Sequence, residues 1–337
     1  MGCGLIGQKR AAALGRARLV ACADARPERA AALAHAAGAA VEHAVEPAVE
    51  PDAARLVART DVDAVIVATT NDALAPTALA AVQAGKHVLV EKPGARSASE
   101  LQPLIRAAAA AGVRVRVGFN HRYHPAIQKA HELVTSGALG PLMFVRGRYG
   151  HGGRVGYERE WRADPALSGG GELIDQGVHL IDLSRWMLGE FTETTGIAHT
   201  YFWRMPVDDN AFMLLRTAAQ QTAMLHVSCT EWKNLFSFEI YGRDAKAHVE
   251  GLGGSYGVER LSFYQMRPEM GPPDTTIWEY PGPDRSWELE FAEFLEDIRL
   301  GRPVSPGLDD ADAALRVVHA IYAQSRLPYG AALAPAE

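Results

Sequence analysis

Short apolar segments alternate with helical patterns along the first 119 residues. Four short apolar segments predict buried strands, at 18–23, 63–69, 87–90 and 113–119, and the one at 87–90 is rich in β-branched residues. Helical patterns follow them at 27–37, 51–58, 76–85 and 97–111, and the last of these begins with the capping-box sequence Ser97-Ala-Ser-Glu100. Repeated βα units with right-handed crossovers predict a parallel, doubly wound α/β sheet of the Rossmann type.

The pattern changes after residue 120. One more helix is predicted at 125–136, and apolar and polar residues then alternate in consecutive segments near 142–149, 213–215, 223–228, 236–241 and 247–250. Consecutive alternating strands are typical of an antiparallel sheet with one covered face. We therefore predict two domains, 1–119 and 120–337, the second an α/β domain with an open, mainly antiparallel sheet.

Composition and charge exclude several classes of partner. The 337-residue chain has a formal net charge of −6, and its Lys and Arg residues are scattered, so we expect neither a nucleic acid nor an anionic membrane as partner. No apolar segment approaches the roughly 18 residues of a membrane span. Cys3, Cys22 and Cys229 show neither metal-ligand spacing nor a disulfide framework, which predicts no metal site and a cytoplasmic location. A small-molecule partner is expected.

Glycines at a helix start form the first candidate binding site. The sequence Gly2-Cys-Gly4-Leu5-Ile6-Gly7 opens a helical pattern that runs through 8–14. Glycines at this spacing let the backbone approach a pyrophosphate, and the helix N-terminus stabilises its charge. Only Met1 precedes Gly2, so the strand that usually opens such a unit is missing or truncated, and we expect the natural chain to begin several residues upstream.

Asp24 ends the predicted strand at 18–23 and stands 17 residues after Gly7. A carboxylate there accepts hydrogen bonds from the ribose hydroxyls of an adenosine and repels the extra phosphate of NADP, which predicts NAD as the preferred cofactor. The guanidinium of Arg26 can pair with that phosphate, so NADP stays an alternative. The side chains of Thr69, Thr70 and Asn71 follow the strand at 63–69 and are further candidates to line the dinucleotide.

A charged pair and a proline end the strand at 87–90. Pro93 removes a backbone donor and restricts the residue before it, so the strand stops at Glu91-Lys92-Pro93. Ligands of doubly wound sheets bind outside the carboxyl ends of the strands, so Lys92 lies where a cofactor headgroup meets a substrate. A solvated lysine in a turn is the alternative. Pro93 is also a candidate for a cis peptide bond.

The second candidate site follows three consecutive glycines, Gly169 to Gly171. Helical spacing runs from Glu172 to Leu188, which places Asp175 and His179 on one face at i and i+4. Together with Lys92 they supply an imidazole that titrates near neutral pH, a carboxylate to orient it and a cation to bind substrate. An isolated pair of this kind is also a common way to satisfy a buried histidine.

A run of cationic and aromatic residues precedes the glycines, at Arg154, Tyr157, Arg159, Trp161 and Arg162. These residues could form a lid over a substrate, with guanidiniums that pair with a phosphate or carboxylate. A solvated loop is the other interpretation of this run.

These motifs together resemble the glucose–fructose oxidoreductase, inositol dehydrogenase and rhizopine-catabolism family (Gfo/Idh/MocA) of NAD(P)-dependent oxidoreductases. The resemblance covers nearly the whole chain and rests on Gly2 to Gly7, Ala68-Thr-Thr-Asn71, Glu91-Lys-Pro93, Gly118-Phe-Asn-His-Arg122 and Gly169-Gly-Gly-Glu-Leu-Ile-Asp175-Gln-Gly-Val-His179. It implies that Lys92 bridges nicotinamide and substrate, that His179 transfers a proton, and that Asp175 contacts the substrate. Leu74 departs from the family pattern, which often has a histidine there, so one contact near the nicotinamide is expected to be lost.

The resemblance also implies the reaction and its partners. Hydride would pass between the nicotinamide and a hydroxyl-bearing or keto carbon of a sugar, cyclic polyol or nucleotide-linked sugar, and the substrate-binding residues would be Lys92, Asn120, Arg122, Trp161, Arg162, Asp175 and His179. The open sheet of such proteins commonly forms a homo-oligomer interface, so a dimer or tetramer is expected. Two alternatives stay open: a catalytically silent sugar- or cofactor-sensing protein, and an enzyme that keeps its nicotinamide bound between two substrates.

Overall fold

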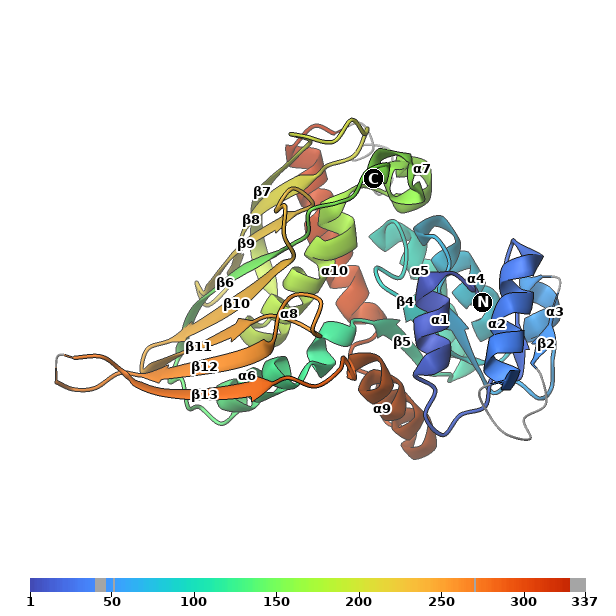
Figure 1. Ribbon diagram of the computed structural model, residues 1–337, viewed down its shortest axis with the longest axis horizontal. Coiled ribbons are helices and arrows are strands. Elements are labelled where there is room, and N and C mark those ends of the chain that lie inside the picture. Colours follow the sequence, from blue (N-terminus) through green and yellow to red (C-terminus); the bar gives the residue numbers. More distant parts are fainter. Residues whose placement is uncertain (40–46, 51, 270, 328–337) are drawn as a thin grey trace. The chain divides into compact units, whose positions relative to one another are not determined.

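The computed structural model describes residues 1–39, 47–50, 52–269 and 271–327. The chain forms two compact units (Figure 1). One unit contains Met1–Phe119 and Trp287–Ala313, and the other contains Asn120–Ser286 and the chain from Ala314 onward. Within the described ranges, no helix combines the length and apolar character needed to cross a bilayer.

The first unit is the parallel α/β fold that the sequence predicted. Strands β3 (Ala64–Val67), β4 (His87–Glu91) and β5 (Val115–Gly118) form a parallel sheet in that order, and β1 (Ala21–Cys22) pairs in parallel with β2 (Ala48–Val49). The first helices of the unit are α1 (Leu5–Ala12), α2 (Pro27–Ala39), α3 (Ala53–Val57), α4 (Asn71–Gln83) and α5 (Ala98–Ala111). Pro51, predicted to open the third helix, lies outside the described residues.

Residues 1 and 2 occupy the position of the expected opening strand. The amino group of Met1 donates to the carbonyl of Ile66 at 2.7 Å, and the Met1 carbonyl accepts from the Ala68 amide at 2.8 Å. On the other side, the Gly2 amide donates to the carbonyl of Ala23 at 2.9 Å. This short segment therefore lies between the β1 and β3 segments and satisfies backbone groups that would otherwise be unpaired.

Helix α4 begins five residues earlier than the sequence predicted. We expected it to start at Pro76, because proline favours a helix N-terminus, but the helix starts at Asn71 and contains Pro76 in its interior. Thr70 is the residue before the helix, with extended backbone angles. Pro76 has no backbone N–H, so α4 lacks one hydrogen bond at this position. The burial of the Leu74, Ala75 and Ala78 side chains offsets this loss.

Helix α5 has the predicted cap. The Ser97 hydroxyl accepts from the amide of Glu100 at 3.2 Å, and the Glu100 carboxylate accepts from the amide of Arg96 at 3.0 Å. In a standard capping box the glutamate would return to the serine amide, so the reciprocal bond is displaced by one residue.

The chain returns to the first unit after residue 286, which the sequence did not predict. Helix α9 (Ser286–Leu300) buries Phe291 and Phe294 in a cluster with Leu89 of β4. We had assigned the whole of 120–337 to the second domain. An amphipathic pattern shows that a helix buries one face, but it does not show which sheet that face covers.

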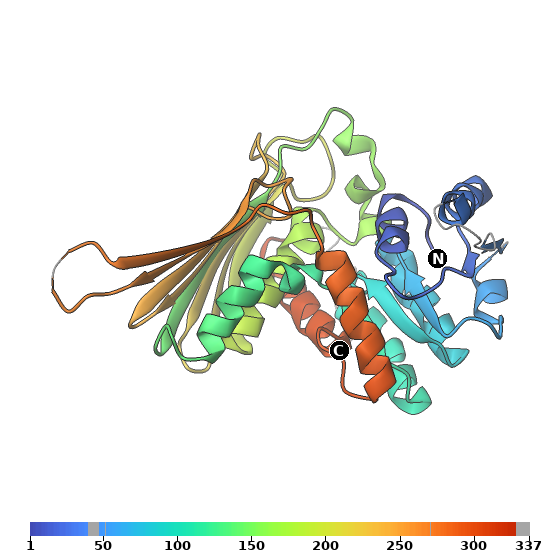
Figure 2. The same cartoon turned by 60° about the horizontal axis from the view of Figure 1, so that its bottom comes forward.

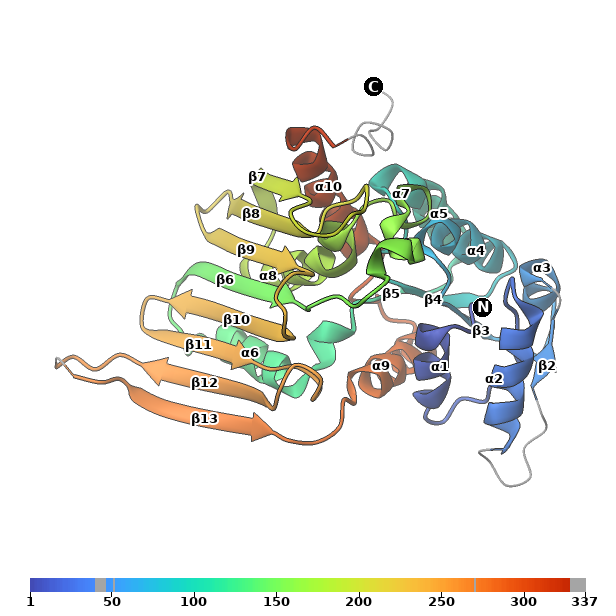
Figure 3. The same cartoon turned by 45° about the horizontal axis from the view of Figure 1, so that its top comes forward.

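The second unit is built on an eight-stranded sheet with the order β13-β12-β11-β10-β6-β9-β8-β7 (Figure 3). All neighbouring pairs are antiparallel except β6 and β9. This confirms the predicted open, mainly antiparallel sheet. The strands are β6 (Leu142–Gly150), β7 (Phe191–His199), β8 (Asn210–Thr217), β9 (Thr222–Ser228), β10 (Leu235–Gly242), β11 (Ala245–Glu250), β12 (Glu259–Gln265) and β13 (Asp274–Tyr280), of which β7, β12 and β13 were not predicted.

Helices cover one face of this sheet (Figures 2 and 3). They include α6 (Pro125–Thr135), α8 (Val178–Leu188) and the C-terminal part of α10 (Leu308–Gln324), and α7 (Pro165–Ser168) is a short helix in the connection after β6. Residues alternate along β8, where Met213 and Leu215 are buried and Phe212 and Leu214 are exposed. The opposite face of the sheet therefore presents apolar side chains to its surroundings.

Candidate active site

The glycine loop of the first unit has the geometry of a phosphate cradle. Gly2 has φ +82°, and a Cβ on Gly7 would lie 2.0 Å from the Gly2 carbonyl oxygen, so both positions require glycine. A Cβ on Gly4 would meet no atom nearer than 3.9 Å. Gly4 therefore borders open space at the N-terminus of α1, where Leu5 is 71% exposed and Ile6 is partly exposed. These residues fit a bound pyrophosphate.

Asp24 lies directly beside this loop. Its carboxylate accepts from the Cys3 amide at 2.6 Å and from the Arg26 amide at 2.8 Å, and the side chain is only partly buried. Asp24 thus holds the loop to the end of β1, while the side chain of Arg26 is exposed. A carboxylate with two oxygens has further lone pairs for ribose hydroxyls.

The predicted dinucleotide-lining residues after β3 lie at the start of α4. The Thr69 hydroxyl donates to the Thr70 carbonyl at 3.1 Å, the Thr70 hydroxyl donates to Asp72 at 2.6 Å, and Asn71 is buried. Leu74 is also buried, which suits an apolar residue at that position.

Lys92 lies in a tight turn at the carboxyl end of β4. The Gly94 amide donates to the Glu91 carbonyl at 2.9 Å and closes the turn, and the Lys92–Pro93 peptide bond is cis. Pro93 is buried and Lys92 is partly exposed. The cation is therefore presented from a well-packed turn, as the sequence predicted for a strand that stops at this point.

Asp175 and His179 lie within one helical turn in the second unit, but the helix differs from the expected one. We predicted a continuous α-helix from Glu172, and the structure has a π-helical turn at Leu173–Gly177 before α8 begins at Val178. A Cβ on Gly177 would lie 2.9 Å from Leu173 Cδ1, so a larger residue there would have to displace the Leu173 side chain. Single π-helical turns are frequent at functional sites.

Aromatic rings surround the buried His179. Its imidazole stacks on that of His121, with ring centroids 3.7 Å apart and an interplanar angle of 25°, and Tyr149 lies edge-on at 6.3 Å. Burial raises the pKa of Tyr149 well above its ordinary value, which keeps the phenol neutral. His121 and Tyr149 were not among the predicted site residues, although His121 stands inside the Gly118 to Arg122 motif.

Arg162 neutralises Asp175. The Arg162 Nε donates to the Asp175 carboxylate at 3.0 Å, and this carboxylate raises the pKa of the guanidinium. Trp161 lies below the guanidinium, 4.7 Å from it to the ring centroid. In the same segment, Arg154 pairs with Glu160 at 2.7 Å. Anion binding by this segment stays a prediction, and the structure gives Arg162 a carboxylate of the chain itself as partner.

Arg122 and Asn120 have partners within the second unit. Arg122 Nε donates to Asp182 of α8 at 2.8 Å, with both side chains buried, and the guanidinium lies over the ring of Trp186 at 5.3 Å. Asn120 is buried and donates to the Ser286 hydroxyl at 2.8 Å. These contacts give Arg122 a part in anchoring the helix that carries His179, and substrate contact by either residue stays a prediction.

Asp208 holds the segment that leads into the π-helical turn before α8, and the sequence did not reveal it. Its carboxylate accepts from the amides of Gly171 at 2.9 Å and Leu173 at 2.8 Å, and its carbonyl accepts from the Glu172 amide at 2.9 Å. A Cβ on Gly171 would lie 1.9 Å from that carbonyl oxygen. Because Asp208 lies in a loop far along the chain, no local spacing pointed to this cap.

A Rossmann-type unit with a glycine loop and a cofactor-side acid, followed by a unit with an Asp–His pair, defines the class of nicotinamide-dependent oxidoreductases. Comparison with family models supports this class. Residues 1–119 match an oxidoreductase family with an NAD-binding Rossmann fold, and residues 127–248 match the GFO/IDH/MocA C-terminal domain. The chain belongs to this family of NAD-binding oxidoreductases, and the predicted resemblance, enzyme class and NAD cofactor are confirmed.

Individual relatives extend over most of the chain. Levoglucosan dehydrogenase of Pseudarthrobacter phenanthrenivorans is 30% identical over 298 residues, 74% of each chain. Inositol 2-dehydrogenase 2 of Saccharopolyspora erythraea is 30% identical over 292 residues, 84% of this chain and 75% of the relative. Inositol 2-dehydrogenase of Rhizobium meliloti is 27% identical over 338 residues, 95% and 94% of the two chains.

Solved structures show the same fold. A levoglucosan dehydrogenase in complex with NADH and levoglucosan superposes with a TM-score of 0.86 at 23% identity, covering 97% of this chain and 98% of that one. An aldose–aldose oxidoreductase from Caulobacter crescentus, complexed with glycerol, gives a TM-score of 0.80 at 26% identity and covers 95% and 92%.

Replacing Asp208 by alanine should destabilise the second unit. The change removes the carboxylate acceptor of the buried Leu173 amide and leaves the Gly171 amide with the Tyr322 hydroxyl at 3.2 Å, which costs about 2 kcal/mol of unfolding free energy. Chemical denaturation of Asp208→Ala beside Asp164→Ala, which removes the more exposed cap of α7, measures the difference. Equal and small losses in the two variants would contradict the assigned role of Asp208.

Proposed function

We propose that this protein transfers hydride between NAD(H) and a carbon that bears a hydroxyl or keto group in a sugar or cyclic polyol. The substrate class is supported by relatives whose names are levoglucosan dehydrogenase and inositol 2-dehydrogenase. The observation that carries the proposal is the Asp175–His179 pair, held within one turn at the start of α8 and surrounded by aromatic rings.

Each of the site residues then has one role in this reaction. Bound NAD supplies the hydride acceptor, and the glycine loop and Asp24 bind and orient its pyrophosphate and adenosine ribose. His179 removes the hydroxyl proton of the substrate during oxidation and returns it during reduction. Asp175 hydrogen-bonds the substrate, and Arg162 holds that carboxylate in place. Lys92 contacts the substrate oxygen and favours its deprotonated form.

The imidazole of His179 should be required for turnover. His179→Ala removes the group that moves the proton and is expected to lower kcat by roughly 10²–10⁴-fold, with the dissociation constant of NADH unchanged. Steady-state rates with a panel of sugars and inositols, and NADH fluorescence titration, measure the two quantities. His131→Ala is the matched control, because that imidazole stacks on Trp186, away from His179. Turnover like that of the wild type would make His179 a packing residue.

Asp24 should set the preference for NAD over NADP. Asp24→Ser removes the negative charge that repels a 2′-phosphate, while its hydroxyl can still accept from one of the amides of Cys3 and Arg26. We expect the ratio of kcat/KM for NADP to that for NAD to rise, and Arg26 to limit the discrimination in the wild type. An unchanged ratio would show that Asp24 does not face the ribose.

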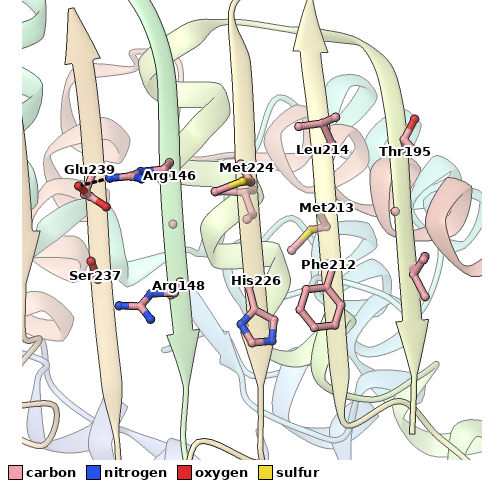
Figure 4. Close-up of a pocket in the computed structure, with 14 residues that line it drawn as sticks. Arg146, Arg148, Thr195, Phe212, Met213, Leu214, Met224, His226, Ser237 and Glu239 are labelled. Carbon is pink, nitrogen blue, oxygen red and sulfur yellow. Dashed lines mark hydrogen bonds and ion pairs between the residues drawn. The ribbon is translucent and has the colours of Figure 1, made fainter. Parts of the chain in front are cut away.

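We further propose that the chain forms a homo-oligomer through the uncovered face of its sheet. This face contains a hollow lined by residues of β6 to β10 (Figure 4). Ile197, Phe212, Leu214 and Met224 lie on it and are 60%, 45%, 49% and 53% exposed. Arg146 and Glu239 form an ion pair at its side. Contiguous exposed apolar side chains with a charged border are typical of protein interfaces.

A charge in the centre of this face should prevent assembly. Light scattering after size-exclusion chromatography is expected to show a dimer or tetramer for the wild type and a monomer for Met224→Glu, because the new carboxylate would be buried without a partner. Leu300→Glu, at an exposed apolar position at the end of α9, is the control and should assemble normally. A monomeric wild type would refute the proposed interface.

We place the protein in the cytoplasm. Support comes from its three cysteines, Cys3, Cys22 and Cys229, which are buried free thiols, the state expected in a reducing compartment. A cytosolic pool of NAD is the cofactor source that this location provides.

A further inference from the structure

Three charged side chains form a buried cluster beneath the carboxyl end of β4. Arg10 of α1 donates from Nε to Glu91 at 2.6 Å and from Nη1 to Glu290 of α9 at 2.5 Å. Arg10 is 2% exposed, Glu91 is 6% exposed and Glu290 is fully buried. The cluster, Glu91–Arg10–Glu290, therefore joins the helix after the glycine loop, the strand that ends at Lys92, and the helix that returns to the first unit.

The surroundings of the cluster fit it closely. A Cβ on Gly118, at the end of β5, would lie 2.7 Å from Arg10 Nη2 and 3.0 Å from Glu91 Oε2, so only glycine leaves room there. Trp287 of α9 lies against the guanidinium of Arg10, 4.5 Å from it to the ring centroid. The guanidinium is thus fixed by two carboxylates and an aromatic ring, and small movements of Glu91 are opposed from both sides.

This arrangement carries a stability cost. Burial raises the pKa of Glu290 from its usual 4.5 to about 7. The charged groups that face Glu290 are Arg10 from α1 and Arg116 from β5, which lower this pKa, and Glu91 from β4, which raises it. The pKa of Glu290 is therefore higher in the folded than in the unfolded chain. Its protonated form contributes stability that is fully present below pH 4.5 and is lost as the pH rises through 7, where the buried carboxylate becomes charged.

We propose that Arg10 and Glu290 are positioning residues for hydride transfer, which hold the Glu91–Gly94 turn, and with it Lys92, through the carboxylate of Glu91. Glu91 is the last residue of β4 and its carboxylate lies in the buried cluster, and Lys92, which follows it directly, is the partly exposed first residue of the turn. Fixing the Glu91 carboxylate fixes the backbone from which the Lys92 side chain extends. The inference rests on the proposed contact of Lys92 with substrate.

The negative charge of Glu290 can be removed by a substitution that keeps the shape of the side chain. Glu290→Gln keeps the volume and one acceptor but weakens the hold on Arg10. At about pH 8.5, where wild-type Glu290 is charged, the kcat of Glu290→Gln should be about 10-fold lower than that of the wild type, because small misplacement of a reacting group is costly. At about pH 6 wild-type Glu290 is mostly protonated, and the two kcat values should agree within about twofold.

The melting temperature of Glu290→Gln should not fall together with its kcat. At about pH 8.5 the substitution removes the cost of a buried carboxylate, so Glu290→Gln should melt at or above the temperature of the wild type while turning over more slowly. A purely structural ion pair would not separate stability from kcat in this way. Amide hydrogen exchange should also quicken at the Glu91–Gly94 turn.

Asp297→Asn is the matched control. Asp297 lies on the same helix, and its carboxylate pairs with the buried Arg116 of β5 and with Arg302. This variant should lower the melting temperature without changing kcat or exchange at the turn. If Glu290→Gln behaves like Asp297→Asn, or if both its kcat and its exchange equal those of the wild type at about pH 8.5, the positioning role is refuted.

Lys92→Ala separates this inference from the proposed function. If that variant keeps wild-type turnover, the role of Lys92 in catalysis fails. Faster exchange at the turn in Glu290→Gln would in that case still support the hold of the cluster on the turn, and unchanged exchange would refute it. If Lys92→Ala is inactive while Glu290→Gln is unaffected in both measurements, the function stands and the positioning role is refuted.

Discussion

Buried arginines that need carboxylate partners organise this structure. A guanidinium keeps its charge at any physiological pH, so it enters a protein interior only with carboxylates around it. Arg10 joins Glu91 and Glu290, Arg116 joins Asp297, and Arg122 joins Asp182. In the first unit these pairs tie α9 to the sheet, and in the second unit one of them ties the segment after residue 120 to the helix that carries His179.

Such pairs contribute more to position than to stability. The desolvation of two ions costs about as much as their attraction returns, and well-packed apolar side chains would often be more stable. What an ion pair adds is direction, because a planar guanidinium donates to its partner carboxylates only along its N–H bonds. The pairs occur next to segments that carry proposed site residues: the turn at Lys92, the helix α8 with His179, and Asp175, which pairs with Arg162.

The sheet of the second unit has apolar side chains on both of its faces, and these side chains alternate along the strands. Residues of β8 such as Met213 and Leu215 pack beneath the helices, while their neighbours Phe212 and Leu214 lie on the uncovered face. A solvated face of an antiparallel sheet is normally polar. The apolar residues on this face therefore set the second unit apart from a simple two-layer domain and supply the surface on which the proposed assembly rests.

The sequence by itself determined the fold class, and it predicted a division near residue 119 and the candidate site positions that local rules mark. Glycine spacing, the strand that stops at Pro93 and the helical spacing of Asp175 and His179 are all local, so each is visible without a structure. Tertiary structure alone decided that Met1 and Gly2 pair between the β1 and β3 segments, that α9 returns to the first unit, and that a π-helical turn precedes α8. It also decided that His121 stacks on His179, that the Asp208 carboxylate accepts from the Gly171 and Leu173 amides, and that Arg10 pairs with Glu290. These contacts join residues far apart in the chain or depend on packing and orientation, and a one-dimensional pattern records which faces are apolar but not which partner covers them.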